Sequence, residues 1–229
     1  MAQVSNGTPP TATRSTGATQ YWSDGSTIYN PNKRKRNHVD SRVVLITGAS
    51  RSGKTTLGKE IVRHYFNTSV MISQDKYRNS SAAPAMVDGR RCLDGANYTD
   101  WGRFERAVID AKRNASLIVV EGYTVCAAPP SLMHMADVVI VIESTIDQTV
   151  TRRTKQNSYP TRNGHGEEGW HDAESYVRGC VWPKHVEYMA DLARLCAAIP
   201  AVVLHASSTV KMRYAQVIDA IGPYLESLG

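Results

Sequence analysis

Residues 48–55 have the sequence Gly-Ala-Ser-Arg-Ser-Gly-Lys-Thr, which matches the phosphate-binding pattern G-x-x-x-x-G-K-[ST] at every fixed position. The apolar run Val43–Ile46 precedes the pattern and predicts a buried strand, while residues 54–66 predict a helix after it. Glycines allow such a loop to turn its backbone N–H groups toward phosphate oxygens, and the helix N-terminus adds positive potential. The sequence therefore predicts a loop that binds the phosphates of a nucleotide.

The residue types in this loop indicate the cofactors. Lys54 can reach the β- and γ-phosphates and is a candidate catalytic residue, and the Thr55 hydroxyl can ligate Mg²⁺. The pair Asn32-Lys33 lies in the N-terminal tail and lacks the aspartate of the guanine-reading motif N-K-x-D, which counts against a GTPase. ATP and Mg²⁺ are therefore the expected cofactors. The expected nucleotide-binding residues are Gly48, Ser50, Ser52, Gly53, Lys54, Thr55 and Thr56.

Apolar runs and helical patterns alternate along the rest of the chain. Further strands are predicted at 69–72, 117–120, 138–142 and 202–204, and further helices at 101–113, 146–155, 184–198 and 209–227. This alternation predicts an α/β P-loop kinase fold, with a doubly wound five-stranded parallel sheet, flanking helices and a lid segment. We assign residues 42–229 to this domain.

Residues 1–41 are predicted to form a disordered basic tail, because they contain too few apolar residues to offset the entropy of ordering. Residues 1–42 hold six basic and two acidic side chains, so most of the net charge of +6 lies there and a nucleic-acid partner is not expected. The run Lys33–Arg36 is either a nuclear localisation signal or a solvated charge run. We expect a cytoplasmic protein, with a nuclear location left open.

The sequence gives no indication of a membrane or disulfide protein. No apolar run approaches the ~18 residues of a transmembrane helix, and the N-terminus lacks a signal-peptide pattern. The four cysteines are widely spaced and contain no C-x-x-C pair, so reduced thiols are expected. They are Cys92, Cys126, Cys180 and Cys196.

Two acidic residues are predicted to lie at the carboxyl ends of strands, where doubly wound sheets bind their ligands. Asp75 follows the strand at 69–72, and could accept a proton from an attacking hydroxyl or cap the next helix. Glu121 ends the run 117–120, and could hold Mg²⁺ through water, bind substrate hydroxyls or be an exposed strand-end acid.

Arg152, Arg153 and Lys155 end a predicted helix, and a Gly-rich charged stretch with Arg162 and Arg178 follows. This arrangement is typical of a mobile lid that brings guanidinium groups onto a transferring phosphoryl group. An ordinary solvated helix end would have the same composition.

Several stretches together resemble the nicotinamide riboside kinases, within the uridine-kinase-like group. They are Gly48–Thr56, Ser73-Gln74-Asp75, the segment from Leu93-Asp94 to Asp100-Trp101, Val120–Tyr123, and Gly179–Pro183. The resemblance implies transfer of the ATP γ-phosphate to the ribose 5′-hydroxyl of a small-molecule nucleoside, producing nicotinamide mononucleotide for NAD synthesis. It also implies Asp75 as the general base, Asp94 as the ligand of the ribose hydroxyls, and Arg152 and Arg153 as catalytic lid arginines. The implied substrate-binding residues are Asp75, Asp94, Glu121 and Tyr123, and the implied metal-binding residues are Thr55 and Glu121.

The chain also departs from the family pattern. Lys76 replaces an acid that often follows the base, Ala96 and Tyr98 replace Pro and Ala, and Arg178 stands where an acid often precedes Gly-x-Val-Trp-Pro. These departures leave two alternatives open: a kinase for another nucleoside such as uridine, or a nucleotide-binding regulator with weak catalysis.

Overall fold

The computed structural model describes residues 41–65, 69–83, 85–87, 90–156, 174–196 and 199–226. The predicted tail at 1–41 lies outside them except for its last residue, and so does the run Lys33–Arg36. The central part of the predicted lid, residues 157–173, also lies outside them.

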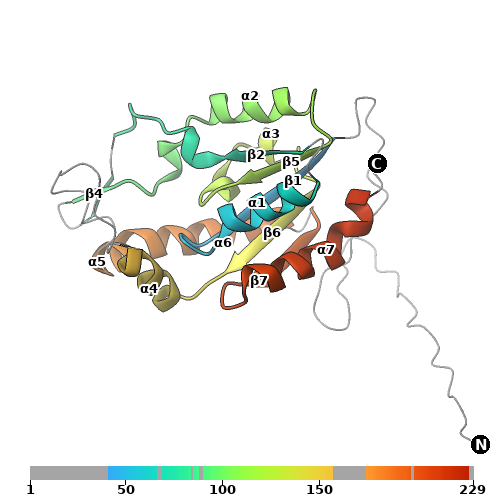
Figure 1. Ribbon diagram of the computed structural model, residues 1–229. Helices are drawn as coiled ribbons and strands as arrows, with labels where there is room; N and C mark the ends of the chain where they lie inside the picture. The colour runs from blue at the N-terminus through green and yellow to red at the C-terminus, as the bar shows by residue number, and fades with distance from the viewer. Residues whose placement is uncertain are drawn as a thin grey trace, which may run out of the picture.

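A five-stranded parallel sheet forms the centre of the domain (Figure 1). Its strand order is β2-β5-β1-β6-β7, so the chain moves outward from β1 in both directions, which is the doubly wound topology that the sequence predicts. The strands are β1 Arg42–Gly48, β2 Ser69–Ser73, β5 Leu117–Glu121, β6 Val138–Glu143 and β7 Ala201–His205.

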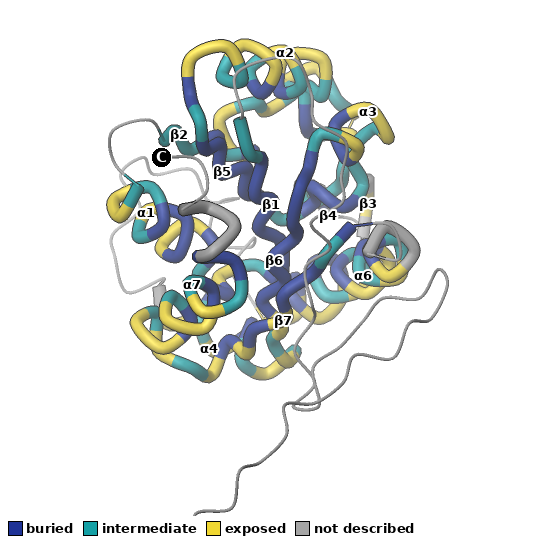
Figure 2. Tube along the Cα trace, turned by 90° about the vertical axis from the view of Figure 1, so that its right-hand side faces the viewer, coloured by how far each residue is buried: buried dark blue, intermediate teal, exposed yellow. Residues whose placement is uncertain are grey.

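Helices cover both faces of this sheet, and Figure 2 shows the buried strands between them. Helices α1 (Lys54–His64) and α7 (Val210–Glu226) cover one face. Helices α2 (Trp101–Ala111), α3 (Pro130–Met133) and α6 (Trp182–Cys196) contribute to the core on the other. Successive strand residues alternate between the two cores, so Leu45 belongs with Phe104 of α2 and Ile46 with Leu57 of α1.

Two smaller regions lie near the carboxyl ends of the strands. Strands β3 (Ala85–Val87) and β4 (Arg90–Cys92) pair in an antiparallel hairpin, which is too short to leave a periodic signal in the sequence. Helix α4 (Ile146–Gln156) precedes the predicted lid. Helix α5 (Glu174–Tyr176) and a π-helical segment (Val177–Val181) follow it and run directly into α6. Short 3₁₀ turns occur at Gln74–Lys76, Ala96–Tyr98 and Val125–Ala127.

The prediction of reduced thiols is wrong for two cysteines. Cys92 and Cys180 form a disulfide, with their Cα atoms 6.2 Å apart although they are separated by 88 residues in the chain. The spacing in the sequence gives no hint of this pair, because it depends on the β3–β4 hairpin meeting the π-helical segment. Cys126 is a buried free thiol. Among the described residues, no helix is long and apolar enough to cross a membrane.

Candidate active site

A cavity of about 660 Å³ opens at the carboxyl ends of β1, β2 and β5. Its walls come from the loop after β1, the turn after β2, the end of β5, the segment after β4 and the end of α4. The lining residues are Ser50, Arg51, Gly53, Lys54, Thr55, Thr56, Asp75, Arg78, Asp94, Glu121, Gly122, Tyr123, Arg152, Arg153 and Lys155. Most of these residues are charged. The cavity is therefore suited to a ligand with several negative charges and to the cations that accompany it.

The loop at 48–55 owes its shape to two glycines. Gly48 has φ = 142°, and a Cβ atom there would collide with the carbonyl oxygen of Ile142 on β6. Gly53 has φ = 99° and immediately precedes α1, where a Cβ atom would lie 3.0 Å from the guanidinium of Arg213. Position 48 therefore requires glycine for conformational and for steric reasons, and position 53 requires it for its positive φ.

Lys54 lies inside the loop at the first residue of α1. Its ammonium donates hydrogen bonds to the carbonyl oxygens of Gly48 (3.0 Å) and Ala49 (2.8 Å). Burial lowers the pKa of Lys54 to about 8, although the carboxylates of Glu121 and Asp75 favour the charged form. The cation is thus held in the cavity with two carboxylates near it.

Arg213 on α7 stabilises the same loop, a role that the sequence did not reveal. Its guanidinium is buried and donates to the carbonyl oxygen of Ser52 at 2.6 Å. The Ser52 side chain is itself buried and, like Gly48, does not line the cavity. The other five predicted nucleotide-binding residues do line it: Ser50, Gly53, Lys54, Thr55 and Thr56.

Thr55 and Glu121 provide oxygen atoms suited to Mg²⁺. The Thr55 hydroxyl donates to Glu121 Oε2 at 3.2 Å, and Glu121 is only 2% exposed. Glu121 Oε1 is buried and accepts no hydrogen bond from the described residues, so this carboxylate oxygen lacks the partner that a buried polar atom normally has. Mg²⁺ commonly binds through one or two protein oxygens together with phosphate oxygens and water, and this pair agrees with that preference.

Asp75 follows β2 in the 3₁₀ turn Gln74–Lys76, and its side chain is exposed into the cavity. The preceding residue, Gln74, is buried and fixes this turn by donating to the hydroxyls of Thr99 (2.6 Å) and Thr124. The Gln74 side-chain oxygen Oε1 accepts from the Thr124 backbone N–H at 3.0 Å. Gln74 is therefore a positioning residue for Asp75, a role that the sequence alone does not indicate.

Arg152 and Arg153 reach the cavity from the last turns of α4. Arg152 donates to the carbonyl oxygen of Ala206, after β7, at 2.6 Å. Arg153 donates to the hydroxyl of Ser50 at 3.3 Å and lies 3.5 Å from Asp94 Oδ1. Arg152 thus connects α4 to the segment after β7, and Arg153 connects it to the phosphate-binding loop and to the segment after β4.

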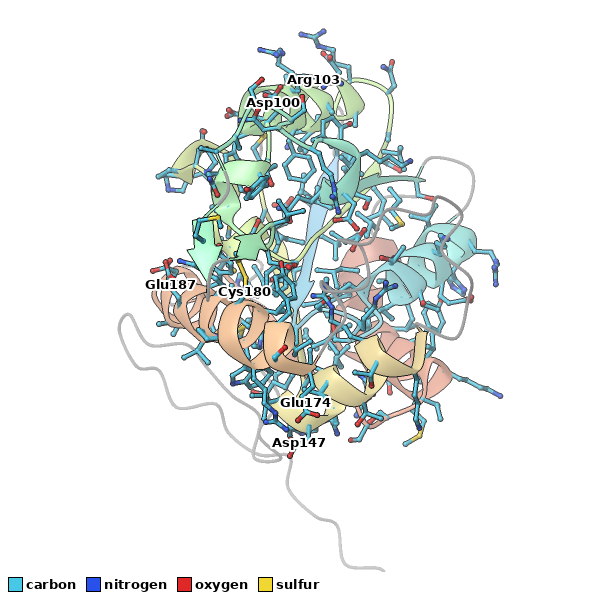
Figure 3. The ribbon with its side chains drawn as sticks, turned by 90° about the vertical axis from the view of Figure 1, so that its left-hand side faces the viewer. Asp100, Arg103, Asp147, Glu174, Cys180 and Glu187 are labelled. Carbon is cyan, nitrogen blue, oxygen red and sulfur yellow. A yellow bond between two sulfur atoms is a disulfide. The ribbon has the colours of Figure 1, made fainter. Side chains whose placement is uncertain are left out.

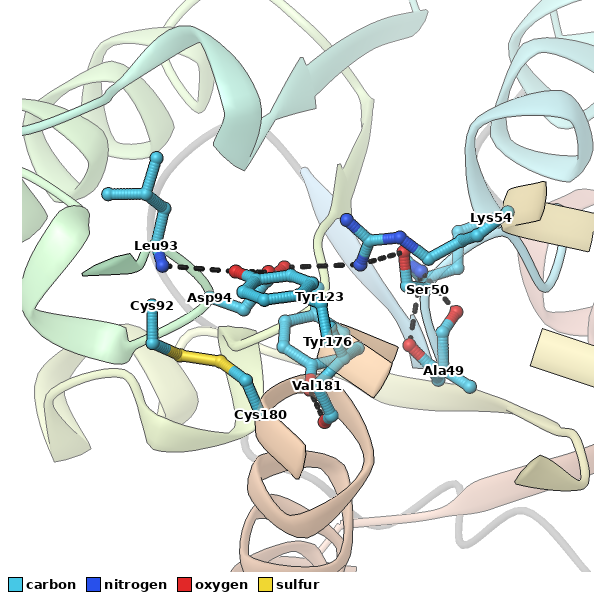
Figure 4. A network of polar contacts seen from close by, with 12 residues as sticks. Ala49, Ser50, Lys54, Cys92, Leu93, Asp94, Tyr123, Tyr176, Cys180 and Val181 are labelled. Carbon is cyan, nitrogen blue, oxygen red and sulfur yellow. Dashed lines mark hydrogen bonds and ion pairs between the residues drawn. A yellow bond between two sulfur atoms is a disulfide. The ribbon is translucent and has the colours of Figure 1, made fainter. Parts of the chain in front are cut away.

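Asp94 lies at the centre of a polar network drawn in Figure 4. Besides Arg153, it contacts Tyr176, whose hydroxyl donates to Asp94 Oδ2 at 2.5 Å. The backbone N–H of Leu93 donates to the same hydroxyl at 3.1 Å. Burial and the Asp94 carboxylate raise the pKa of Tyr176, so its hydroxyl stays protonated and donates to the carboxylate.

A smaller cavity of about 100 Å³ adjoins the first, next to Asp75 and Asp94. Tyr123 borders both cavities, and its hydroxyl donates to the carbonyl oxygen of Val181. Arg78 also borders both, and its exposed guanidinium forms no hydrogen bond or ion pair with any described residue. Arg78 was not among the predicted site residues, although its position three residues after Asp75 could have suggested it.

Arg178 lies in the π-helical segment and does not line either cavity. It pairs with Glu174 at 2.7 Å and with Asp147 of α4 at 2.8 Å. Figure 3 shows these two acids close together at the edge of the domain. Arg178 therefore connects the two segments that flank residues 157–173. Arg162 lies outside the described residues.

Comparison with known proteins identifies the fold. No protein-family model and no curated protein sequence matches this chain. A gluconokinase from Sinorhizobium meliloti 1021 aligns with a TM-score of 0.51 at 13% identity, over 84% of this chain and 97% of the gluconokinase. The structure of a protein named APE1195 aligns with a TM-score of 0.47 at 14% identity, over 82% of this chain and 98% of that one.

The gluconokinase likeness, the strand order and the phosphate-binding loop together confirm the predicted fold class. The chain has the α/β fold of the P-loop kinases, with the loop at the position that this fold gives it. At 13% identity the likeness extends to the fold and not to the acceptor.

Proposed function

We propose that this protein is an ATP-dependent kinase that phosphorylates the ribose 5′-hydroxyl of a small-molecule nucleoside, with nicotinamide riboside as the first candidate. The observation that carries the proposal is that one cavity holds a P-loop lysine, a candidate Mg²⁺ pair, an exposed aspartate and the Arg153–Asp94 ion pair. With nicotinamide riboside the product would be nicotinamide mononucleotide, a precursor for NAD synthesis.

In this proposal each side chain has one task in the transfer. A bond forms between the acceptor oxygen and the γ-phosphorus, the bond from that phosphorus to the β,γ-bridging oxygen breaks, and ADP leaves. Asp75 accepts the proton of the attacking hydroxyl. Lys54, Arg152 and Arg153 offset the negative charge of the transferring group. Thr55 and Glu121 would hold Mg²⁺, which would neutralise additional charge on the phosphates.

The nucleoside assignment depends mainly on Asp94 and on the aromatic wall of the smaller cavity. A carboxylate can accept hydrogen bonds from two neighbouring hydroxyls, and a ribose offers such a pair at C2′ and C3′. Tyr98 and Tyr123 line the same cavity and offer ring surface to a base. In this assignment Glu121 binds the metal ion, and Tyr123 packs against the nucleobase.

Arg78 favours a second candidate acceptor, a sugar acid. The Arg78 guanidinium has no partner among the described residues and lines the smaller cavity together with Asp75 and Asp94, so it is suited to bind a carboxylate of the acceptor in bidentate fashion. The gluconokinase with the same fold is named for an acceptor of this class. A nicotinamide nucleoside carries a positive ring, so Arg78 would not help to bind it.

The proposal is tested by incubating the protein with MgATP and a panel of nicotinamide riboside, uridine, their 2′-deoxy analogues and gluconate, with product masses as the readout. We expect a product 80 mass units heavier from a ribonucleoside, where ~80 is the mass that one phosphoryl group adds. If gluconate is the one acceptor that is phosphorylated, the acceptor is a sugar acid and the nucleoside assignment is wrong. Tight ATP binding with no product from any acceptor would indicate the nucleotide-binding regulator instead.

Replacement of Asp94 by alanine is expected to raise the KM for the nucleoside by roughly 10- to 100-fold, because charge-assisted hydrogen bonds contribute about 1.5–3 kcal/mol. The KM for ATP should change little, since Asp94 is on the acceptor side of the cavity. Steady-state kinetics with each substrate varied in turn measure both. Asp219→Ala, an exposed change on α7, is the matched control. Equal use of the 2′-deoxy analogue by the wild type would contradict the role given to Asp94.

Arg78→Ala distinguishes the two acceptor classes. For a sugar acid, we expect kcat/KM to fall by roughly 10-fold or more, because the carboxylate loses its bidentate partner. For nicotinamide riboside, we expect kcat/KM to remain equal or to rise, because a like charge is removed. The measurement is kcat/KM of wild type and variant for both acceptors, with Arg103→Ala on the exposed side of α2 as the control. A large loss with the nucleoside would contradict this assignment of Arg78.

A further inference from the structure

The Cys92–Cys180 disulfide lies close to Asp94, which lines both cavities, as Figure 4 shows. Cys92 is the last residue of β4 and stands two positions before Asp94. Cys180 belongs to the π-helical segment, four residues after Tyr176. Both cysteines are 2% exposed. The cross-link therefore joins the segment that carries Asp94 to the segment that carries its tyrosine partner.

Tyr176 makes a second connection between these segments. Its hydroxyl accepts from the Leu93 N–H and donates to Asp94, so it binds two consecutive residues after Cys92. Cys92 and Cys180 share a buried cluster with Tyr176, and the other members are Val150, Val177 and Val181. The disulfide and the tyrosine thus fix the Asp94 carboxylate near Arg153.

The β3–β4 hairpin that precedes Asp94 is short. Its strands β3 and β4 have three residues each, and a short isolated two-stranded hairpin is marginally stable in water. Holding a binding group in place before the ligand arrives lowers the ordering cost of binding. The disulfide at the end of β4 holds Leu93 and Asp94 in place in this way.

We propose that the Cys92–Cys180 disulfide is a positioning element of the acceptor site, and that its reduction weakens acceptor binding while leaving the nucleotide site intact. This inference rests on the proposed function, in which Asp94 binds the acceptor. The phosphate-binding loop is anchored separately by Arg213 and by its own glycines. Activity would therefore depend on the redox state of the protein through the acceptor alone.

The redox step is a thiol–disulfide exchange with a small-molecule thiol of the glutathione class. Two such thiols lose two protons and two electrons and become a disulfide, while Cys92 and Cys180 gain them and become two thiols. A thiolate attacks one sulfur and forms a mixed disulfide, which the second thiol resolves. Because both sulfurs are buried, the attack requires local opening of the hairpin or of the π-helical segment.

The experiment compares the full-length protein before and after treatment with dithiothreitol, alongside the variants Cys92→Ser and Cys180→Ser. Reduction is expected to raise the acceptor KM roughly tenfold, because the acceptor must then order the Asp94 segment when it binds. The KM for ATP should stay unchanged. Each serine variant should resemble the reduced wild type and should not respond to dithiothreitol. Cys126→Ser, which removes the buried free thiol, is the control and should respond as the wild type does.

Three results of this comparison would overturn the proposal. The first is a wild-type acceptor KM that does not change on verified reduction. The second is a parallel rise of the KM for ATP, which would indicate a general structural role. The third is the detection of free Cys92 and Cys180 thiols by mass spectrometry in protein purified without reductant. If a serine variant fails to fold, the comparison of the acceptor KM between oxidised and reduced wild type still tests the proposal.

Amide hydrogen exchange separates failure of this inference from failure of the proposed function. The Leu93 amide donates to Tyr176, and its exchange should accelerate on reduction, whereas the amides of β1 should not change. If no acceptor in the panel is phosphorylated, the proposed function fails, and the Leu93 amide still tests the positioning. Unchanged exchange at residues 92–96 after reduction would overturn it.

Discussion

Replacement of Lys54 by alanine should lower kcat by about 10²–10³, the usual effect of losing one preorganised group that stabilises charge in the transition state. Lys54 is buried in the phosphate-binding loop, where its ammonium contacts two loop carbonyls and is near Glu121 and Asp75. In the proposed reaction it is the cation next to the β- and γ-phosphates. The measurement is product formation under saturating MgATP.

The control for this change is Lys59→Ala, an exposed position on the same helix. It should behave as the wild type, which excludes an effect of net charge or helix stability. A Lys54→Ala protein with wild-type turnover would contradict the assignment of residues 48–55 as a catalytic phosphate-binding loop.

The pKa of Lys54 gives the same prediction a second readout. Burial lowers this pKa to about 8, so the free protein loses the positive charge as the pH rises through that value. The KM for ATP in the wild type should therefore rise above pH 8, because the neutral amine attracts phosphate less. The Lys54→Ala protein should lack this particular dependence.

Local patterns explain why the sequence predicted the sheet and the loop. The central strands are uninterrupted runs of aliphatic residues because both faces of the sheet are covered, and the run at 138–142 corresponds to β6 with one residue added. The loop depends on two glycines and a lysine within eight residues. Each signal is contained in a few consecutive positions.

The features that were missed depend on residues far apart in the chain. Arg213 contacts Ser52 across 161 residues, and Cys92 contacts Cys180 across 88. Neither pairing has a sequence signal, because the first depends on how helix α7 packs beside the loop and the second on how the β3–β4 hairpin meets the π-helical segment. Gln74 immediately precedes Asp75, and its role depends on the hydrogen bond to Thr124. Arg78 follows Asp75 by three residues, and its role depends on the smaller cavity that it lines.

Replacement of Asp75 by asparagine should lower kcat by about 10²–10⁴, the usual contribution of a general base. Asparagine keeps the size of the side chain and lacks a carboxylate to accept the proton of the attacking hydroxyl. Asp75 is exposed into the cavity, and the buried hydrogen bonds of Gln74 fix its turn at the end of β2. The backbone of the variant should therefore keep its position.

Nucleotide binding should persist in the Asp75→Asn protein, because the loop at 48–55 is untouched. Calorimetric titration with a non-hydrolysable ATP analogue and Mg²⁺ measures this separately from turnover. Asp110→Asn removes a carboxylate from the exposed Asp110–Arg113 pair on α2 and should leave both quantities unchanged. If Asp75→Asn instead kept its kcat and lost only affinity for the nucleotide, Asp75 would belong to the nucleotide or metal site. The base in the proposed reaction would then have to be sought in Asp94, the other aspartate that borders both cavities.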